Sequence, residues 1–310
     1  MGYRLPDVLS VVLRTLSFLL LFQAAGVAIF IAVFGDGLAS SHVSIRRLGR
    51  AAASAGVVFV GAHFAFEAAR MAGEMSGILD PELQGIAWNS PARVALICRL
   101  VGLLCIAVGL QAAGVRSMAV AVIGALLATG AFTLTGHTSI GPHRVALAAL
   151  LMLHVLVAAF WFGALWPLYV ASLRETPARA SALIERFTAV ATWLVPVILL
   201  AGIVMAVLLL PNLSALSEPY GKLLVAKVVG FALLMGLASA NKWRLGPALV
   251  RGSQHSARWF RRSVAAEYVL IAAVLSITAV MTSFFSPGST DLALLNASNG
   301  ESIRLTVEGP

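Results

Sequence analysis

Charged residues are scarce in this sequence: they make up 11% of its 310 residues, whereas soluble domains carry about 25%. Cysteine is nearly absent as well. The two cysteines, Cys98 and Cys105, lie in one apolar run and are too far apart along a helix to form a disulfide. No Gly-x-Ser-x-Gly, His-Glu-x-x-His or glycine-rich phosphate-binding motif occurs. These absences exclude a soluble domain, and they predict that the protein is not an enzyme.

Apolar residues fill the space that charged residues leave. They make up 60% of the chain, its mean hydropathy is +0.93, and they occur in runs long enough to cross the hydrocarbon core of a bilayer as helices. The alternating pattern of a membrane barrel does not occur, and a backbone exposed to lipid must satisfy its own hydrogen bonds. The fold class is therefore all-α: a polytopic transmembrane helical bundle embedded in a lipid bilayer.

The apolar runs predict about eight spans. We place them near residues 8–34, 51–72, 92–110, 117–135, 145–171, 187–210, 222–240 and 264–285. Residues 1–285 then form one transmembrane helical bundle, and residues 286–310 form a short polar tail that is too small to be a domain of its own.

Basic residues cluster in alternate connections between the predicted spans. The first, third, fifth and seventh connections carry most of them, whereas the second carries Glu74, Asp80 and Glu82. Because Lys and Arg favour the cytoplasmic side, the odd connections are predicted to face the cytoplasm. Both termini and the 136–144 loop then face outward. This distribution accounts for the net charge of +9, so we predict no nucleic-acid partner.

Histidine and methionine side chains concentrate toward the predicted outer half. The candidate metal ligands are His63, His137, His143, His154, Met71, Met75 and Met152. His137 and His143 fall in the outer loop, and His63 and His154 fall near mid-depth on two different spans. Met71 and Met75 are spaced one helical turn apart. Imidazole and thioether groups suit copper, and thioethers favour Cu+. The pattern predicts a copper path from the outer face, although methionine also fills gaps between helices.

A polar stripe follows the second span. His63, Glu67, Met71 and Glu74 have the spacing i, i+4, i+8 and i+11, which places them on one face of a helix. One interpretation is a ladder of polar groups from the outer surface to mid-membrane. The structural alternative is a Glu67–Arg70 ion pair, with His63 hydrogen-bonded to a neighbouring helix.

Positive charge also lies deep in the predicted outer half, at Arg99 and Lys227 among others. Excess positive charge repels an entering cation, so an anionic partner is expected. The propionates of haem b are one candidate, with His63 and His154 as axial ligands. Trp161 shares a helical stripe with His154 and serves either packing or the pathway.

An ordered set of short motifs over residues 130–285 resembles the copper resistance protein D (CopD/PcoD) family. The set consists of Thr135-Gly136-His137, Leu153-His154, Phe160-Trp161-Phe162-Gly163-Ala164-Leu165, Arg186-Phe187, Gly202, Tyr220-Gly221-Lys222-Leu223-Leu224, Lys227, Asn241-Lys242-Trp243-Arg244-Leu245-Gly246-Pro247, Arg261-Arg262-Ser263 and Glu267. The resemblance implies a bacterial inner-membrane protein of copper homeostasis and copper resistance. It also implies a periplasmic copper-binding protein as partner. The chain departs from the family in lacking a Met-rich or His-rich periplasmic segment.

These observations leave three functions open. The first is transport of periplasmic copper, as Cu+, into or across the inner membrane. The second is electron transfer or metal reduction by a b-type haem between His63 and His154. The third is a scaffold for a copper chaperone, which would bind neither metal nor haem. The direction of any transport stays open.

Overall fold

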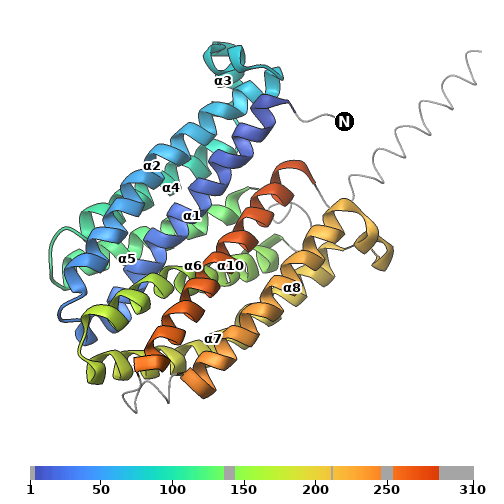
Figure 1. Cartoon of the computed structure of the whole chain (residues 1–310). Coiled ribbons are helices and arrows are strands. Elements are labelled where there is room, and N and C mark those ends of the chain that lie inside the picture. The colour runs from blue at the N-terminus through green and yellow to red at the C-terminus, as the bar shows by residue number, and fades with distance from the viewer. Residues whose placement is uncertain (1–3, 136–143, 211, 246–253, 286–310) are drawn as a thin grey trace, which may run out of the picture.

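The structure is a computed structural model that describes residues 4–135, 144–210, 212–245 and 254–285. Its described part is helical throughout (Figure 1). The long helices are α1 (Leu5–Phe34), α2 (His42–Ala72), α4 (Ala92–Gly109), α5 (Val115–Gly130), α6 (Arg144–Arg174), α7 (Pro177–Leu209), α8 (Pro219–Ala240) and α10 (Gln254–Phe284). Eight helical segments in the described residues are long and apolar enough to span a membrane, which confirms the predicted bundle.

Short elements complete the connections. They are the 3-10 turns η1 (Gly35–Gly37), η2 (Met75–Leu79), η3 (Ala131–Leu134) and η5 (Leu213–Ser217), the helix α3 (Pro81–Trp88), and the π-helical turn η6 (Asn241–Leu245). Local sequence explains several boundaries. Asp80 caps α3 by accepting hydrogen bonds from the backbone N–H groups of Glu82 and Leu83. Proline stands at the start of α3, α7 and α8, where a missing N–H costs nothing.

Three helices begin about ten residues earlier than the apolar runs predict. α2 begins at His42, α7 at Pro177 and α10 at Gln254. Their first turns are rich in Arg, Ala and Ser rather than in apolar residues. A helix does not stop where the hydrocarbon stops, because arginine and alanine favour helix and arginine is solvated at the interface. The hydropathy of the sequence therefore marks the buried length of each span and not the length of its helix.

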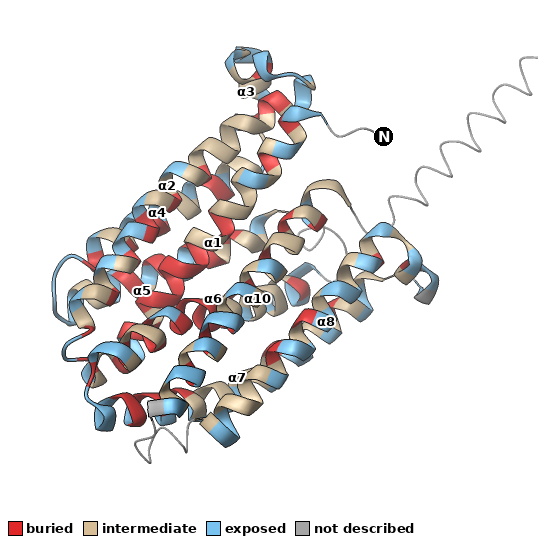
Figure 2. Ribbon diagram, in the orientation of Figure 1, coloured by how far each residue is buried: buried red, intermediate tan, exposed pale blue. Residues whose placement is uncertain are grey.

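α1 is the central helix of the bundle (Figure 2). Of the residues in its most apolar stretch 67% are buried, compared with 11% for α7 and for α8. It packs against α2, α5, α6 and α10, whereas α7 packs mainly on α6, and α8 on α10. The outer surfaces of α7 and α8 are therefore left to lipid.

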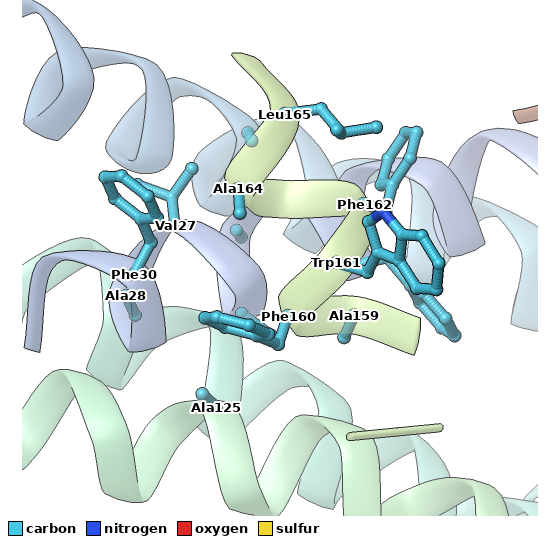
Figure 3. Close-up of a cluster of buried hydrophobic side chains, with 14 of the residues drawn as sticks. Val27, Ala28, Phe30, Ala125, Ala159, Phe160, Trp161, Phe162, Ala164 and Leu165 are labelled. Carbon is cyan, nitrogen blue, oxygen red and sulfur yellow. The ribbon is translucent and has the colours of Figure 1, made fainter. Parts of the chain in front are cut away.

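α1 and α6 cross in backbone contact. A Cβ at Gly26 would lie 2.0 Å from the carbonyl oxygen of Ala159 and 2.7 Å from Cα of Gly163. Small residues at such crossings let two helices approach closely in a membrane. Figure 3 shows the side chains around this crossing, with Phe30 and Phe160 filling one side and Trp161 and Phe162 the other. Gly163 therefore lets α1 approach the backbone of α6 closely.

The first, third and fifth connections meet at one end of the bundle. The Arg46 guanidinium donates to the carbonyl oxygen of Leu110, 3.2 Å away, and so ties the start of α2 to the end of α4. Glu175, between α6 and α7, accepts hydrogen bonds from the backbone N–H groups of Ala39 and Ser41 at 2.9 and 2.8 Å. This end is the one predicted to face the cytoplasm, and the opposite end carries α3 (Figure 1).

Candidate functional site

A network of charged side chains joins the N-terminal part of α1 to the C-terminal part of α2. Arg14 donates from Nε to Nε2 of His63 at 3.0 Å, and its Nη2 lies 3.5 Å from Oε1 of Glu67. Ser10 donates to the same carboxylate oxygen at 3.2 Å. The structural alternative for His63, a hydrogen bond to a neighbouring helix, is the arrangement found. Local spacing could not indicate this bond, because Arg14 and His63 are 49 positions apart.

Arg70 extends the network toward the surface. Its Nη1 lies 3.2 Å from Oε2 of Glu67, so the ion pair predicted from their spacing is confirmed. Its Nε lies 3.8 Å from Oδ1 of Asp7 on α1. Glu67 therefore receives two guanidinium groups and one hydroxyl, and its carboxylate is held by the protein itself.

The same two arginines bind the C-terminal end of α10. Arg14 Nη1 donates to the carbonyl oxygen of Thr282 at 2.8 Å, and Arg70 Nη2 donates to that of Ser283 at 3.3 Å. The last carbonyl groups of a helix have no partner within the helix, and its C-terminus carries partial negative charge. The network therefore joins α1, α2 and α10, and the positive charges of Arg14 and Arg70 have a structural use.

The predicted polar stripe on α2 is shorter than its spacing suggested. α2 ends at Ala72, and Gly73 adopts a positive φ of 75°, a conformation that ends helices and suits glycine. Glu74 follows in extended backbone, and Met75 begins η2. Glu74 therefore does not continue the helical face of His63 and Glu67. Met71 and Met75 are both exposed, and the prediction that they form a one-turn pair on one helix is wrong.

Arg99 on α4 lies close to this network. Its guanidinium stacks over the ring of Phe132, with 4.6 Å from Cζ to the ring centroid, and its buried Nε has no hydrogen-bond partner. Arg14, Arg70 and Arg99 all interact electrostatically with His63. A cation approaching His63 would therefore meet three guanidinium groups.

His154 is arranged differently. Its Nδ1 lies 3.2 Å from the carbonyl oxygen of Ile198 on α7. The ring also packs against Gly202, where a Cβ would lie 3.5 Å from Cε1 of His154. A carbonyl oxygen only accepts, so Nδ1 carries the proton and Nε2 keeps its lone pair. Metal-binding histidines characteristically donate one ring N–H to such an acceptor while the other nitrogen holds the metal. Lys227 on α8 is close enough to interact electrostatically with the ring.

Met152 and Trp161, also on α6, contact other elements than His154 does. The Met152 sulfur lies 3.5 Å from the position that a Cβ on Gly130 would take, so this side chain packs on the end of α5. Two residues along a helix point to different faces, and Met152 therefore does not share the face of His154. Trp161 is buried, and its indole hydrogen-bonds Glu267 on α10.

In the described part of the chain the two predicted intramembrane ligands, His63 and His154, have different partners. No group of three or more His, Cys, Asp or Glu there is placed to hold a metal ion. His63 is bonded to α1 and His154 to α7, and the two rings have no partner in common. His137 and His143 lie outside the described residues.

Eight apolar helices in the described part of the chain, three of them joined by a charged network, define a multi-pass helical membrane protein. Two family models match it: "Copper resistance protein D-like, N-terminal domain" over residues 5–145, and "Copper resistance protein D" over residues 181–281. The chain belongs to the copper resistance protein D family.

Two curated relatives agree with these matches. "Copper resistance protein D" of Pseudomonas syringae pv. tomato is 34% identical over 172 residues, which cover 50% of this chain and 54% of the relative. "Inner membrane protein YebZ" of Escherichia coli (strain K12) is 28% identical over 132 residues, 42% of this chain and 46% of the relative. The matched region thus spans about half the length of each relative. No solved structure matches the chain. With its spans and its family, the chain is a multi-pass protein of the bacterial inner membrane.

Proposed function

We propose that this protein moves copper into or across the inner membrane, with His154 as the ligand inside the bilayer. The observation that carries the proposal is the hydrogen bond between His154 Nδ1 and the carbonyl oxygen of Ile198, which fixes the ring and leaves Nε2 free. The family of the chain indicates which metal is moved, because one relative bears the name copper resistance protein D. Copper is the cargo in this proposal, carried as Cu+.

His63 takes a second role in the proposed pathway. Nε2 accepts from Arg14, so the neutral ring carries its proton on Nδ1 and has no free lone pair in this state. Copper binding at His63 requires Arg14 to leave, and Glu67 is the carboxylate that would retain it, at 3.5 Å. We infer that the described state is closed to copper at His63 and that a rearrangement of Arg14 opens it.

Cells expressing the full-length protein test the pathway directly. Cellular copper is measured at matched expression for the wild type, His154→Ala and His63→Ala, with His42→Ala as a control near the other end of α2. We expect both pathway variants to lose the copper accumulation that depends on the protein, and His42→Ala to keep it. Unchanged accumulation in His154→Ala and His63→Ala would remove the proposed pathway.

The haem alternative has one observation in its favour and one against it. The buried Arg99 Nε without a partner suits an anionic group near His63. The two histidines, however, do not fit axial ligation of one haem in this arrangement, because His63 Nε2 is bonded to Arg14 and the rings have partners on different helices. A visible spectrum of the purified protein decides: a Soret band that both histidine variants lack would establish haem.

Delivery of copper completes the proposal. The His63 network carries three guanidinium groups, so free copper ions are repelled there. We propose that a periplasmic copper-binding protein hands over the metal. His137 and His143 in the predicted outer loop would be receiving ligands, and the exposed Met71 and Met75 would add thioether ligands on the same predicted side. Direct transfer avoids a free cation. Glu74 would contribute negative charge at the same surface.

A further inference from the structure

A cavity of about 230 Å³ lies at the end of the bundle opposite the His63 network. Residues of α6, α7, α8, η6 and α10 line it, and they come from the C-terminal parts of α6 and α8 and the N-terminal parts of α7 and α10. With the predicted orientation it lies in the cytoplasmic half. Liquid water occupies about 30 Å³ per molecule, so the space is large enough for a small hydrated ion.

A buried carboxylate faces this cavity. Glu267 is only 4% exposed and accepts hydrogen bonds from Asn241 Nδ2, at 2.5 Å, and from the Trp161 indole. Both donors are neutral. Among the described Lys, Arg and His residues none forms an ion pair with it. Lys242 also lines the cavity, but its Nζ donates to the Thr192 hydroxyl at 3.1 Å. A carboxylate so placed in a membrane lacks the counter-charge that its burial demands.

A second oxygen in the same lining is unpartnered. Oδ1 of Asn241 is buried and has no hydrogen-bond partner, while Nδ2 of the same side chain binds Glu267. Asn241 is also the first residue of the π-helical turn η6, and short π-helical turns occur often at functional sites. A carboxylate and a free carboxamide oxygen are thus held side by side at one wall of the cavity.

We propose that Glu267 and Asn241 form a binding site for a hard monovalent cation, Na⁺ or a hydrated proton, which enters through this cavity. Oxygen donors suit hard cations, and a single carboxylate balances a single charge. Among the described residues of the lining there is no His or Cys, and Met235 is the one sulfur-containing side chain, so the site does not suit copper. It stands apart from the His154 pathway and does not depend on copper transport.

Tryptophan fluorescence reports on this site because Trp161 is bonded to Glu267. The purified full-length protein in nanodiscs is titrated with Na⁺ at constant ionic strength, with choline as the replacement, and separately with acid in the absence of Na⁺. Binding of radioactive Na⁺ is measured in parallel. We expect a saturable signal in one of the two titrations: the Na⁺ arm identifies Na⁺, and the acid arm identifies the proton.

Three variants test whether the signal comes from the proposed Glu267–Asn241 site. Glu267→Gln keeps the shape and removes the charge, and it should weaken the response by about tenfold or more. Asn241→Ala should weaken it as well, and it replaces Glu267→Gln if that variant fails to fold. Glu185→Gln removes an exposed carboxyl on α7 and should change nothing. A response that survives in both site variants, or the absence of any response to Na⁺ and acid in the wild type, would overturn the proposal.

Discussion

Arg14 of α1 and His63 of α2 are joined by a hydrogen bond from guanidinium Nε to imidazole Nε2, 3.0 Å long. The side chain of Arg14 is 17% exposed and that of His63 12%, so the bond is largely shielded from water. A histidine that fixes an arginine in this way is a structural partner first, and becomes a metal ligand only after the arginine has moved. This relationship separates the two intramembrane histidines into a closed position and an available one.

The Arg14–His63 bond should be measurable as a coupling free energy. In a double-mutant cycle with Arg14→Met and His63→Gln, we expect about 1.5–3 kcal/mol of coupling, the range for hydrogen bonds to charged groups. Unfolding in mixed micelles gives the free energies. Arg179→Met, at an exposed position in the first turn of α7, is the control and should change stability by less than about 0.5 kcal/mol. Additive single mutants would show that the two side chains do not interact.

The crossing of α1 and α6 should not tolerate a methyl group. In Gly26→Ala the new Cβ would meet the carbonyl oxygen of Ala159, so we expect a loss of at least about 3 kcal/mol in the free energy of unfolding. Gly61→Ala is a matched control in the middle of α2, where a Cβ meets nothing within 4 Å. It should be neutral or gain up to about 1 kcal/mol, because alanine favours helix. Similar stabilities for the two variants would contradict this account of the crossing.

Glu175 should make the stability of the protein depend on pH at the end of the bundle where the first, third and fifth connections meet. Burial raises the pKa of this carboxyl, but hydrogen bonds from the Ser41 hydroxyl and from the backbone N–H groups of residues 39–41 together outweigh it and lower the pKa below the usual 4.5. The stabilisation is therefore complete above pH 4.5 and is lost as the pH falls below 4.5, through the lowered value in the folded protein.

A comparison of the wild type with Glu175→Gln measures this contribution. The wild type should be the more stable protein at pH 7, and the difference in unfolding free energy should shrink steadily as the pH falls from 5 to 3. Glu185→Gln, at an exposed position on α7, should show no such convergence. A difference that stays constant with pH would mean that Glu175 acts through packing alone.

The predicted orientation can be tested with single cysteines. With Cys98 and Cys105 replaced by alanine, Leu79→Cys and Val115→Cys place thiols at positions that are 86% and 87% exposed, at opposite ends of the bundle. A membrane-impermeant thiol reagent applied to cells with a permeable outer membrane should label residue 79. It should label residue 115 only after the inner membrane is opened. The reverse pattern would invert the topology, and with it the side from which His137 and His143 are reached.

The sequence predicts the bundle well because the bilayer imposes a simple rule on it. Each span needs a long apolar run. The run near residues 92–110 locates α4 almost to the residue, and the run near 117–135 covers most of α5 together with the 3-10 turn η3 that follows it. Local spacing also predicts the Glu67–Arg70 pair, because both residues stand on one helix. Where a polar segment continues a helix, as at the start of α2, hydropathy carries no signal and the boundary is missed.

The partners of the site residues lie beyond what spacing can predict. Arg14 contacts His63, which lies 49 positions away, and Trp161 on α6 contacts Glu267 on α10, with α7 and α8 between them in the sequence. Such contacts depend on which helices become neighbours and on their rotation about their own axes, and apolar runs encode neither. The Met71–Met75 pair fails for a local reason, since Gly73 ends the helix between them. The prediction that His63 and His154 share one centre needs both the choice of neighbouring helices and the rotation of each helix about its axis.

The hydrogen bond from Arg14 to the carbonyl oxygen of Thr282 connects residues that are 268 positions apart, and Tyr268 reaches back to Gln23 in the same way. During synthesis α1 enters the membrane before α10, and its polar side chains acquire these partners only when α10 has been inserted. Until then Arg14 and Gln23 must be shielded by the insertion machinery or by α2. Assembly of this bundle therefore includes the packing of α10 back onto α1, and a chain that stops before α10 lacks the hydrogen bonds of Arg14 to Thr282 and of Tyr268 to Gln23.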